Sequence, residues 1–347
     1  MRLWAAFKKQ NKLYLRKCWV FSQTDAILAS CLGCILLKND QLKIYSLLGG
    51  VSNLDISQFL QYIFSGLTMG SVYALIAISL VMVYKVSKII MFAQGEFFVL
   101  GALIMISLSS LNFIPMPIAF VLSIALVSLV GISIERVLIQ PLLGSSIGKL
   151  VTLTIAVSLA LRGLLMIIWG RESQVLPPFS AEKSVNIYGA VLSFQVIWIV
   201  VVTAIVLLAI WFFFEKTFTG LAIRATSENR IGASLVGISV PKVSMIAWAL
   251  GASLGALAGI LIAPLIYIGY ASGIMPMFKG FTAMAIGGLN SNSGAVVAGL
   301  IVGILESFTI GFISSQFSNA IVFALLIAVL VFKPGGLFGN VEESGGM

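Results

Sequence analysis

The chain has 347 residues, of which 60% are hydrophobic and only 10% are charged, and its formal net charge is +9. Soluble domains average about 25% charged residues, so this composition excludes a soluble globular protein and favours a membrane protein. The positive charge would suggest a nucleic-acid partner in a soluble protein. In a membrane protein, the enrichment of lysine and arginine on the cytoplasmic side explains it more simply.

Residues 1–57 are predicted to form a basic N-terminal extension, to which we assign no function. Its beginning is rich in lysine and arginine and has no acidic residue, which favours a cytoplasmic location. The apolar stretch 18–37, interrupted by Asp25, is predicted to be an additional transmembrane segment or a signal-like segment. Cys31 and Cys34 lie in this stretch, and the chain contains no histidine, so we predict no zinc or other metal site.

Residues 58–340 are predicted to form one transmembrane domain, followed by a short tail at 341–347. Apolar stretches long enough to cross about 30 Å of hydrocarbon recur along it. We therefore expect an all-α polytopic membrane protein with about 8–10 transmembrane helices, including broken or half-spanning segments. The candidate spans are 59–84, 92–110, 114–138, 149–170, 188–214, 243–268, 277–290, 293–310 and 316–332.

Alternation of the spans predicts which segments are cytoplasmic. If the polar loop between the spans 188–214 and 243–268 is cytoplasmic, then 85–91, 139–148 and the C-terminal tail lie on the same side. These segments and the N-terminus carry most of the lysines and arginines, as the positive-inside rule requires. Half-spans within 277–310 leave the last two crossings open.

Two segments within the apolar spans are interrupted by glycine and polar residues. In transporters, such broken helices often mark the substrate path, because their freed backbone groups need water or ligand. The alternative is structural: a tight turn at 289–294, and an acid favoured by the helix dipole at the start of a helix. The candidate pathway residues are Gln94, Gly95, Glu96, Gly287, Gly288 and Asn290.

Two further charged residues, Arg162 and Glu306, lie within predicted spans. A charge inside the membrane is costly and points to function by default. Arg162, however, is about two turns from the outer end of its span and can extend its guanidinium towards the interface. We expect structural roles for both residues and consider them as partners of one another.

The polar loop 220–238 is too long for a simple turn between two spans. It has about four turns of helix-compatible sequence and several small residues, which let another protein approach closely. We predict that it docks a cytosolic partner. The candidate docking residues are Arg224, Ala225, Glu228, Asn229, Arg230, Ala233 and Gly237.

Glycines at a spacing of four residues mark faces for helix packing. Gly251, Gly255 and Gly259 share one face of the span 243–268, and Gly299 and Gly303 repeat the spacing. Small residues let helix backbones approach where lipid provides no hydrophobic drive. We predict helix packing, with pore lining as the alternative.

No catalytic constellation is recognisable. The segment 144–150 is one residue short of a phosphate-binding loop and ends in leucine, so it lacks the hydroxyl that would hold Mg²⁺. We therefore predict a transport subunit that is not an enzyme and binds no cofactor. If ATP drives transport, another subunit hydrolyses it.

Several sequence segments, taken in their order along the chain, together resemble a known family over about residues 59–340. They are 66–77, 92–97, 161–163, 224–238, 250–264, 279–289 and 332–338. In their order and spacing the chain resembles the inner-membrane permeases of the high-affinity branched-chain amino acid ABC importer family.

The resemblance implies the ABC importer permease fold and transport of branched-chain or other hydrophobic amino acids across the cytoplasmic membrane. It implies a second permease subunit, cytosolic ATPase subunits and an extracytoplasmic substrate-binding protein as partners, and no nucleic acid. Residues 220–238 match the coupling loop of the family. They depart from its pattern at Ile231 and Gly232, where relatives often have an acid before a pair of alanines.

Two alternatives stay open. A permease for urea or short-chain amides resembles the same family. An ion-coupled secondary transporter would use Glu96 as its ion-binding acid, but it would leave the long docking loop unexplained.

Overall fold

The computed structural model describes residues 56–111, 113–142, 145–179, 184–187 and 190–338, which belong to the compact unit Asp55–Met347. The predictions for 18–37 and 341–347 lie outside the described residues. So does nearly all of the predicted extension 1–57.

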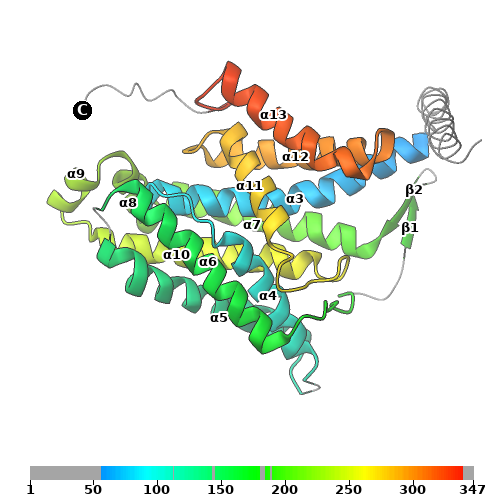
Figure 1. Ribbon diagram of the computed structural model, residues 1–347, viewed down its shortest axis with the longest axis horizontal. Coiled ribbons are helices and arrows are strands. Elements are labelled where there is room, and N and C mark those ends of the chain that lie inside the picture. The colour runs from blue at the N-terminus through cyan, green and yellow to red at the C-terminus, as the bar shows by residue number, and fades with distance from the viewer. Residues whose placement is uncertain (1–55, 112, 143–144, 180–183, 188–189, 339–347) are drawn as a thin grey trace, which may run out of the picture. The chain divides into compact units, whose positions relative to one another are not determined.

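Helix α3 (Ile56–Ser87) is the central helix of this unit. Helices α12 (Asn292–Phe312), α10 (Val240–Ile262), α11 (Ile274–Gly287) and α7 (Phe194–Lys216) all pack against it (Figure 1). In its most apolar window of 18 residues, 89% of the residues are buried. Over that window the helix contacts protein and hardly any lipid, whereas its first turns, with Ile56 and Phe59, are exposed.

Glycines explain how closely α3 and α12 approach. A methyl group added to Gly299 would lie 2.6 Å from the Cα atom of Ala74, and one added to Gly303 would overlap the backbone of Gly70. On the α3 side of the same contact, a methyl group on Gly66 would lie 2.7 Å from the Cα atom of Ile304 in α12. Backbone-to-backbone packing of this kind provides dispersion contacts where lipid provides no hydrophobic drive.

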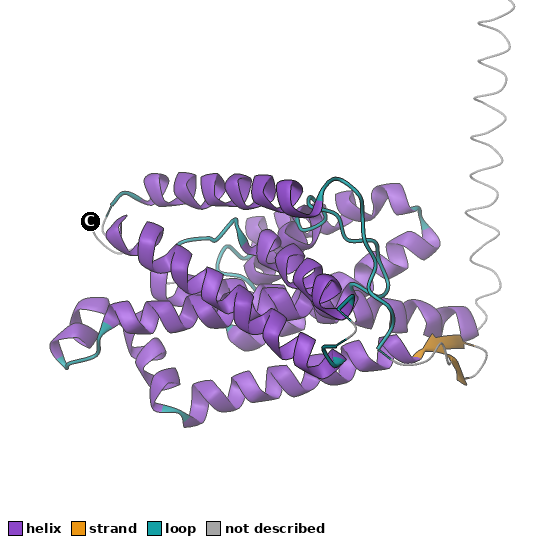
Figure 2. Ribbon diagram, turned by 90° about the horizontal axis from the view of Figure 1, so that it is seen from below, coloured by secondary structure: helices purple, strands orange, loops and turns teal. Residues whose placement is uncertain are grey.

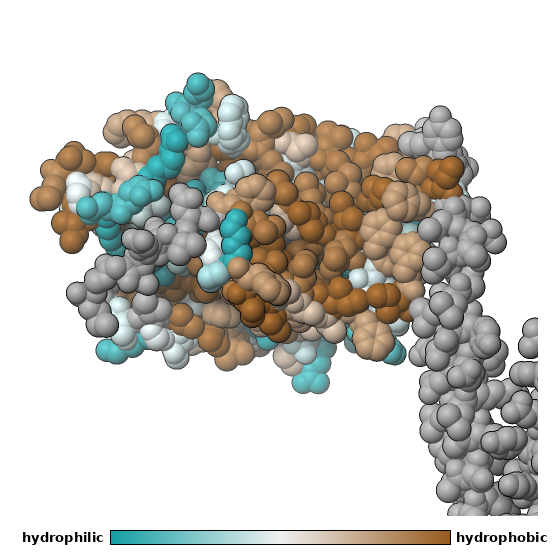
Figure 3. Space-filling model, turned by 90° about the horizontal axis from the view of Figure 1, so that it is seen from above, coloured by the Kyte–Doolittle hydropathy of each residue, from teal (hydrophilic) through white to brown (hydrophobic). Residues whose placement is uncertain are grey.

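The outer helices have mostly exposed apolar surfaces. They are α5 (Met116–Ile134), α6 (Ile147–Trp169), α7 and α13 (Ser318–Phe332), and α5 continues through the π-helical turn η1 (Glu135–Ile139) and the 3₁₀ turn η2 (Gln140–Leu142). A further 3₁₀ turn, η3 (Ser315–Phe317), precedes α13. In the most apolar 18-residue window of each outer helix, the share of buried residues falls from 28% for the α5 segment to 11% for the α13 segment. Hydrophobic residues dominate the face in Figure 3, and hydrophilic ones gather towards one end.

The structure confirms the predicted fold class. In the described part of the chain, seven helices are long and apolar enough to cross a membrane. Two more apolar helices, α4 (Gln94–Ser109) and α11, have only 16 and 14 residues. Because a crossing needs about 20 residues, these two are the half-spanning segments that the sequence predicts.

Two predicted span boundaries were wrong. The span expected from residue 188 begins as a helix only at Phe194, because β1 (Ser184–Ile187) and β2 (Ala190–Ser193) form an antiparallel hairpin (Figure 2). The span expected to reach residue 268 ends at Ile262. Pro264 follows almost at once and cannot continue the backbone hydrogen bonds of a helix.

Candidate functional site

The loop between α7 and α10 folds into two short helices, α8 (Phe218–Glu228) and α9 (Arg230–Leu235). The hairpin β1–β2 and these helices lie at opposite ends of α7, at the right and left of Figure 1. The predicted helical character of this loop is therefore found, but as two helices that meet at Asn229.

Three residues of the loop set this shape. Thr217 caps α8 by accepting a hydrogen bond from the Gly220 backbone amide at 3.0 Å. Asn229 interrupts the helix and caps α9, because its side-chain oxygen accepts from the Gly232 amide at 2.8 Å. Gly237 ends α9 with a φ of +89°, a conformation that favours glycine.

The exposed tip of α9 is apolar, which sequence reasoning missed because it looked for small residues. Ile231, Leu235 and Val236 are 74%, 82% and 77% exposed. Ala233 instead is only 4% exposed, so its methyl group packs within the chain and is not available to a partner. Large apolar side chains held in a polar loop indicate a protein-binding surface.

The other candidate docking residues lie around this tip. Glu228, Asn229, Arg230 and Gly237 are exposed, and Ala225 is partly buried. Arg224 pairs within the chain, with an Nη1–Oε1 distance of 3.2 Å to Glu215.

The first turns of α4 and α11 meet inside the bundle. A methyl group on Gly273 would overlap the carbonyl oxygen of Gly95, so the two backbones touch. Beside this contact, Gln94 is fully buried and donates a hydrogen bond of 3.0 Å to the Gly251 carbonyl of α10. Gly255 leaves room for the same amide, because a methyl group there would overlap its nitrogen.

Helix α10 therefore meets two neighbours through its glycines. A methyl group on Gly251 would lie 2.8 Å from the side chain of Val83 in α3. One on Gly259 would overlap the Phe98 carbonyl of α4. These glycines lie at helix contacts within the chain.

Glu96, the next candidate pathway residue, is in an ion pair at the start of α4. The Arg162 guanidinium of α6 donates to Glu96 Oε1 at 2.6 Å, and the Ser158 hydroxyl donates to the same oxygen at 2.8 Å. The Glu96 side chain is 2% exposed, whereas that of Arg162 is 25% exposed. The N-terminal position of Glu96 in α4 also favours its negative charge through the helix dipole.

Glu306 pairs elsewhere, so the expectation that Arg162 and Glu306 are partners was wrong. Glu306 of α12 accepts from the Lys279 ammonium of α11 at 2.5 Å and from the Tyr73 hydroxyl of α3 at 2.7 Å. The sequence spacing of 233 residues between Tyr73 and Glu306 offers no local pattern that would have revealed this contact. The triad ties the three helices together.

Gly287 is the last residue of α11, and Gly288 and Asn290 lie in the tight turn between α11 and α12. Gly288 has a φ of +107°, and Asn290 is exposed. The amides of Leu337 and Phe338 donate to the carbonyls of Ile286 and Gly287, at 2.7 and 3.2 Å. The chain after α13 thus covers the end of α11, and this turn lies apart from Gln94 and Glu96 along the bundle.

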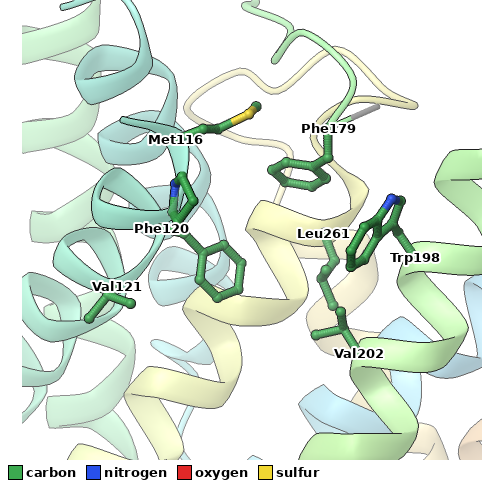
Figure 4. A pocket seen from close by; sticks show the side chains of 8 residues that line it. Met116, Phe120, Val121, Phe179, Trp198, Val202 and Leu261 are labelled. Atoms are coloured by element: carbon green, nitrogen blue, oxygen red, sulfur yellow. The ribbon is translucent and has the colours of Figure 1, made fainter. Parts of the chain in front are cut away.

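A cavity of about 500 Å³ opens between α5, α7 and α10 (Figure 4). Phe120 of α5 and Trp198 of α7 lie on either side of it, and Leu261 projects from α10. Its lining residues are all apolar: Met116, Pro117, Phe120, Val121, Phe179, Trp198, Val202 and Leu261. Their side chains can accommodate an apolar group, but they provide no charge to hold a polar one.

Comparison with known proteins identifies the family. Residues 62–330 match the family described as the permease component of the branched-chain amino acid transport system. The high-affinity branched-chain amino acid permease protein BraD of Pseudomonas aeruginosa is 34% identical, over 83% of this chain and 98% of its own length. LivH of Escherichia coli, with the same description, is 35% identical over 82% and 96%.

A more distant relative has a similar description. The probable branched-chain amino acid transport permease LivH of Methanocaldococcus jannaschii is 28% identical, over 76% of this chain and 88% of its own length. The match of the family over most of the chain and the curated relatives above 30% agree with the bundle of spanning and half-spanning helices. This chain therefore belongs to the branched-chain amino acid permease family.

Proposed function

We propose that this chain is the membrane permease subunit of an importer for branched-chain amino acids, driven by ATP hydrolysis in a separate subunit. Family membership supports the transport role and favours these substrates over urea or short amides, since the relatives at 34–35% identity carry this description. The multi-pass bundle fits a permease of the cytoplasmic membrane. In this proposal the chain binds no cofactor of its own.

The observation that carries the proposal is the exposed apolar tip of α9, on a loop that α7 and α10 hold at one end of the bundle. Exposure of the apolar side chains of Leu235 and Val236 to water is unfavourable, and a cytosolic ATPase subunit would cover them. The neighbouring Arg230 and Glu228 would provide a polar rim. Movement of the ATPase would then reach the bundle through α8, which packs on α3, α7 and α10.

The partners complete the importer. A second permease subunit would cover part of the exposed outer helices, and an extracytoplasmic binding protein would deliver the amino acid at the end that carries the β1–β2 hairpin. We keep Gln94, Gly95 and Glu96 as pathway candidates. Because Gly287 ends α11 and Gly288 follows it in the turn, we assign both to shaping the end of α11.

The test is co-purification of this chain with ATPase subunits from its native membrane. Leu235→Glu is expected to abolish co-purification and amino acid uptake while the protein still inserts into the membrane. Leu142→Glu, a matched change at a residue 37% exposed in the turn before α6, is the control and should keep both. Full co-purification of Leu235→Glu would contradict docking on this tip, and uptake that follows the proton gradient without ATP would contradict the whole proposal.

A further inference from the structure

The pair formed by Arg162 and Glu96 differs from the other ion pair within the bundle. Lys279 and Glu306 are each 7% exposed, and both carboxylate oxygens of Glu306 accept a hydrogen bond. In the Arg162–Glu96 pair, Glu96 Oε2 and Arg162 Nε are buried and have no hydrogen-bond partner among the described residues. Both carboxylate oxygens of Glu306 are therefore used, whereas the Arg162–Glu96 pair keeps one buried acceptor and one buried donor without a partner among the described residues.

The pair also lies at the edge of the packed face of α6. Ser158 and Leu165 on this helix are buried, whereas Leu159 and Leu164 are 60% and 53% exposed. Arg162 lies at the boundary, with a quarter of its side chain exposed. Charged residues within a membrane span face a protein interior or a water-filled cavity and avoid lipid. The guanidinium donates to Glu96 instead of extending to the interface, so we expect the surface at Arg162 to face a protein or a polar path.

We propose that Glu96 and Arg162 together form the contact for the charged head group of the amino acid during its passage. The inference rests on the proposed function, which makes a zwitterionic amino acid the cargo. At neutral pH such a molecule carries one carboxylate and one ammonium group. The guanidinium of Arg162 complements the carboxylate, and the carboxylate of Glu96 complements the ammonium.

The geometry explains why the two protein charges are paired before the cargo arrives. In this conformation each charge neutralises the other, so neither is left alone in a low-dielectric interior. When the pair opens, the carboxylate of the amino acid takes the place of Glu96 beside Arg162, and its ammonium group takes the place of Arg162 beside Glu96. Because the head group is zwitterionic, the net charge of the site stays constant. Ser158 keeps Glu96 in place through its hydrogen bond to Oε1.

The experiment uses the full transporter, assembled with its ATPase subunits and binding protein in proteoliposomes. It measures both ATP hydrolysis stimulated by the loaded binding protein and amino acid uptake, so that their ratio is known. Arg162→Gln and Glu96→Gln are expected to lower the uptake per ATP by about tenfold or more, since a hydrogen bond to a charged group is lost. Arg162→Lys should recover most of it.

Two controls separate head-group contact from structure. Gly163→Ala changes the same helix next to Arg162 but leaves both charges and Ser158 in place, and nothing lies within 4 Å of the added carbon, so it should keep the wild-type ratio. The double variant Glu96→Gln/Arg162→Gln removes the unpaired charge that could harm folding in the single variants. It should assemble and hydrolyse ATP but remain uncoupled from uptake.

The outcomes are distinct. A wild-type ratio in the double variant would show that the pair is only structural and would overturn the inference. An uncoupled double variant supports it. Failure of the wild-type chain to assemble with an ATPase would instead contradict the proposed function itself.

Discussion

The ammonium group of Lys279 lies 2.5 Å from a carboxylate oxygen of Glu306, and each of these side chains is only 7% exposed. The Tyr73 hydroxyl donates to the other oxygen, so both oxygens of Glu306 accept a hydrogen bond at the contact of α3, α11 and α12. An ion pair of this kind need not add net stability, but breaking one side of it leaves a buried charge alone.

The first prediction follows from this difference between an intact buried ion pair and one that has lost a partner. Lys279→Met should destabilise the protein by about 3–5 kcal/mol, because Glu306 then remains charged without its counter-ion. The double variant Lys279→Met/Glu306→Gln should recover much of this loss. Thermal unfolding of the purified protein in detergent, followed by tryptophan fluorescence, measures both. A double variant as unstable as the single one would contradict the explanation.

The second prediction concerns the contact between α3 and α12. Gly303→Ala should cost about 1–3 kcal/mol, because its methyl group would overlap the Gly70 backbone and force the helices apart. Gly163→Ala on α6 is the matched control, since nothing lies within 4 Å of the added carbon. Both variants are compared by the same thermal assay. Equal stability of the two would show that the close approach is not required.

The third prediction separates backbone strain from steric blocking at Gly237. No atom lies within 4 Å of a carbon added there, but the φ of +89° is unfavourable for other residues. Gly237→Val should therefore distort the end of α9 at a cost of about 1–3 kcal/mol, whereas Gly237→Asn should be milder. Binding of the ATPase subunits, measured by titration, should weaken in that order. If asparagine weakens binding as much as valine, the partner touches this position directly.

The fourth prediction is a suppressor pair at Gln94 and Gly255. Gly255→Ala alone should destabilise the contact of α4 with α10, since the methyl group overlaps the Gln94 amide. In the double variant Gln94→Ala/Gly255→Ala that amide is gone, so the two changes should be less than additive by about 0.5–3 kcal/mol. A complete double-mutant cycle by thermal unfolding gives the coupling. Strict additivity would exclude the contact.

Much of the fold could be predicted because membrane helices are recognisable in a sequence by the length and apolar composition of their segments. The nine helices predicted between 59 and 332 all occur in the described residues, most with ends within a few positions. Errors arose at Ala190 and at Ile262, where an apolar strand and a nearby proline end the helical pattern. Hydropathy alone does not distinguish an apolar strand from an apolar helix.

The candidate site was less predictable, because its contacts join residues far apart in sequence. The sequence suggested that Glu96, Arg162 and Glu306 were unusual, but it could not say which charges meet. The exposed tip at Leu235 and Val236 was missed for another reason. From sequence alone, a leucine in a polar loop is expected to face inward. Here the helix is interrupted at Asn229, and Leu235 on the separate helix α9 is exposed.

The enclosure of α3 has a consequence for the order of synthesis. This helix is the earliest of the described spans to leave the ribosome, yet its partner residue for Tyr73 is made 233 residues later. Helices α7, α10 and α11 are made before that point and can already pack against α3, but the glycine face that meets α12 still lacks its partner. The hydroxyls of Thr68 and Ser71 donate to carbonyls of their own helix and so tolerate that interval. The bundle therefore closes around its oldest helix only when α12 arrives.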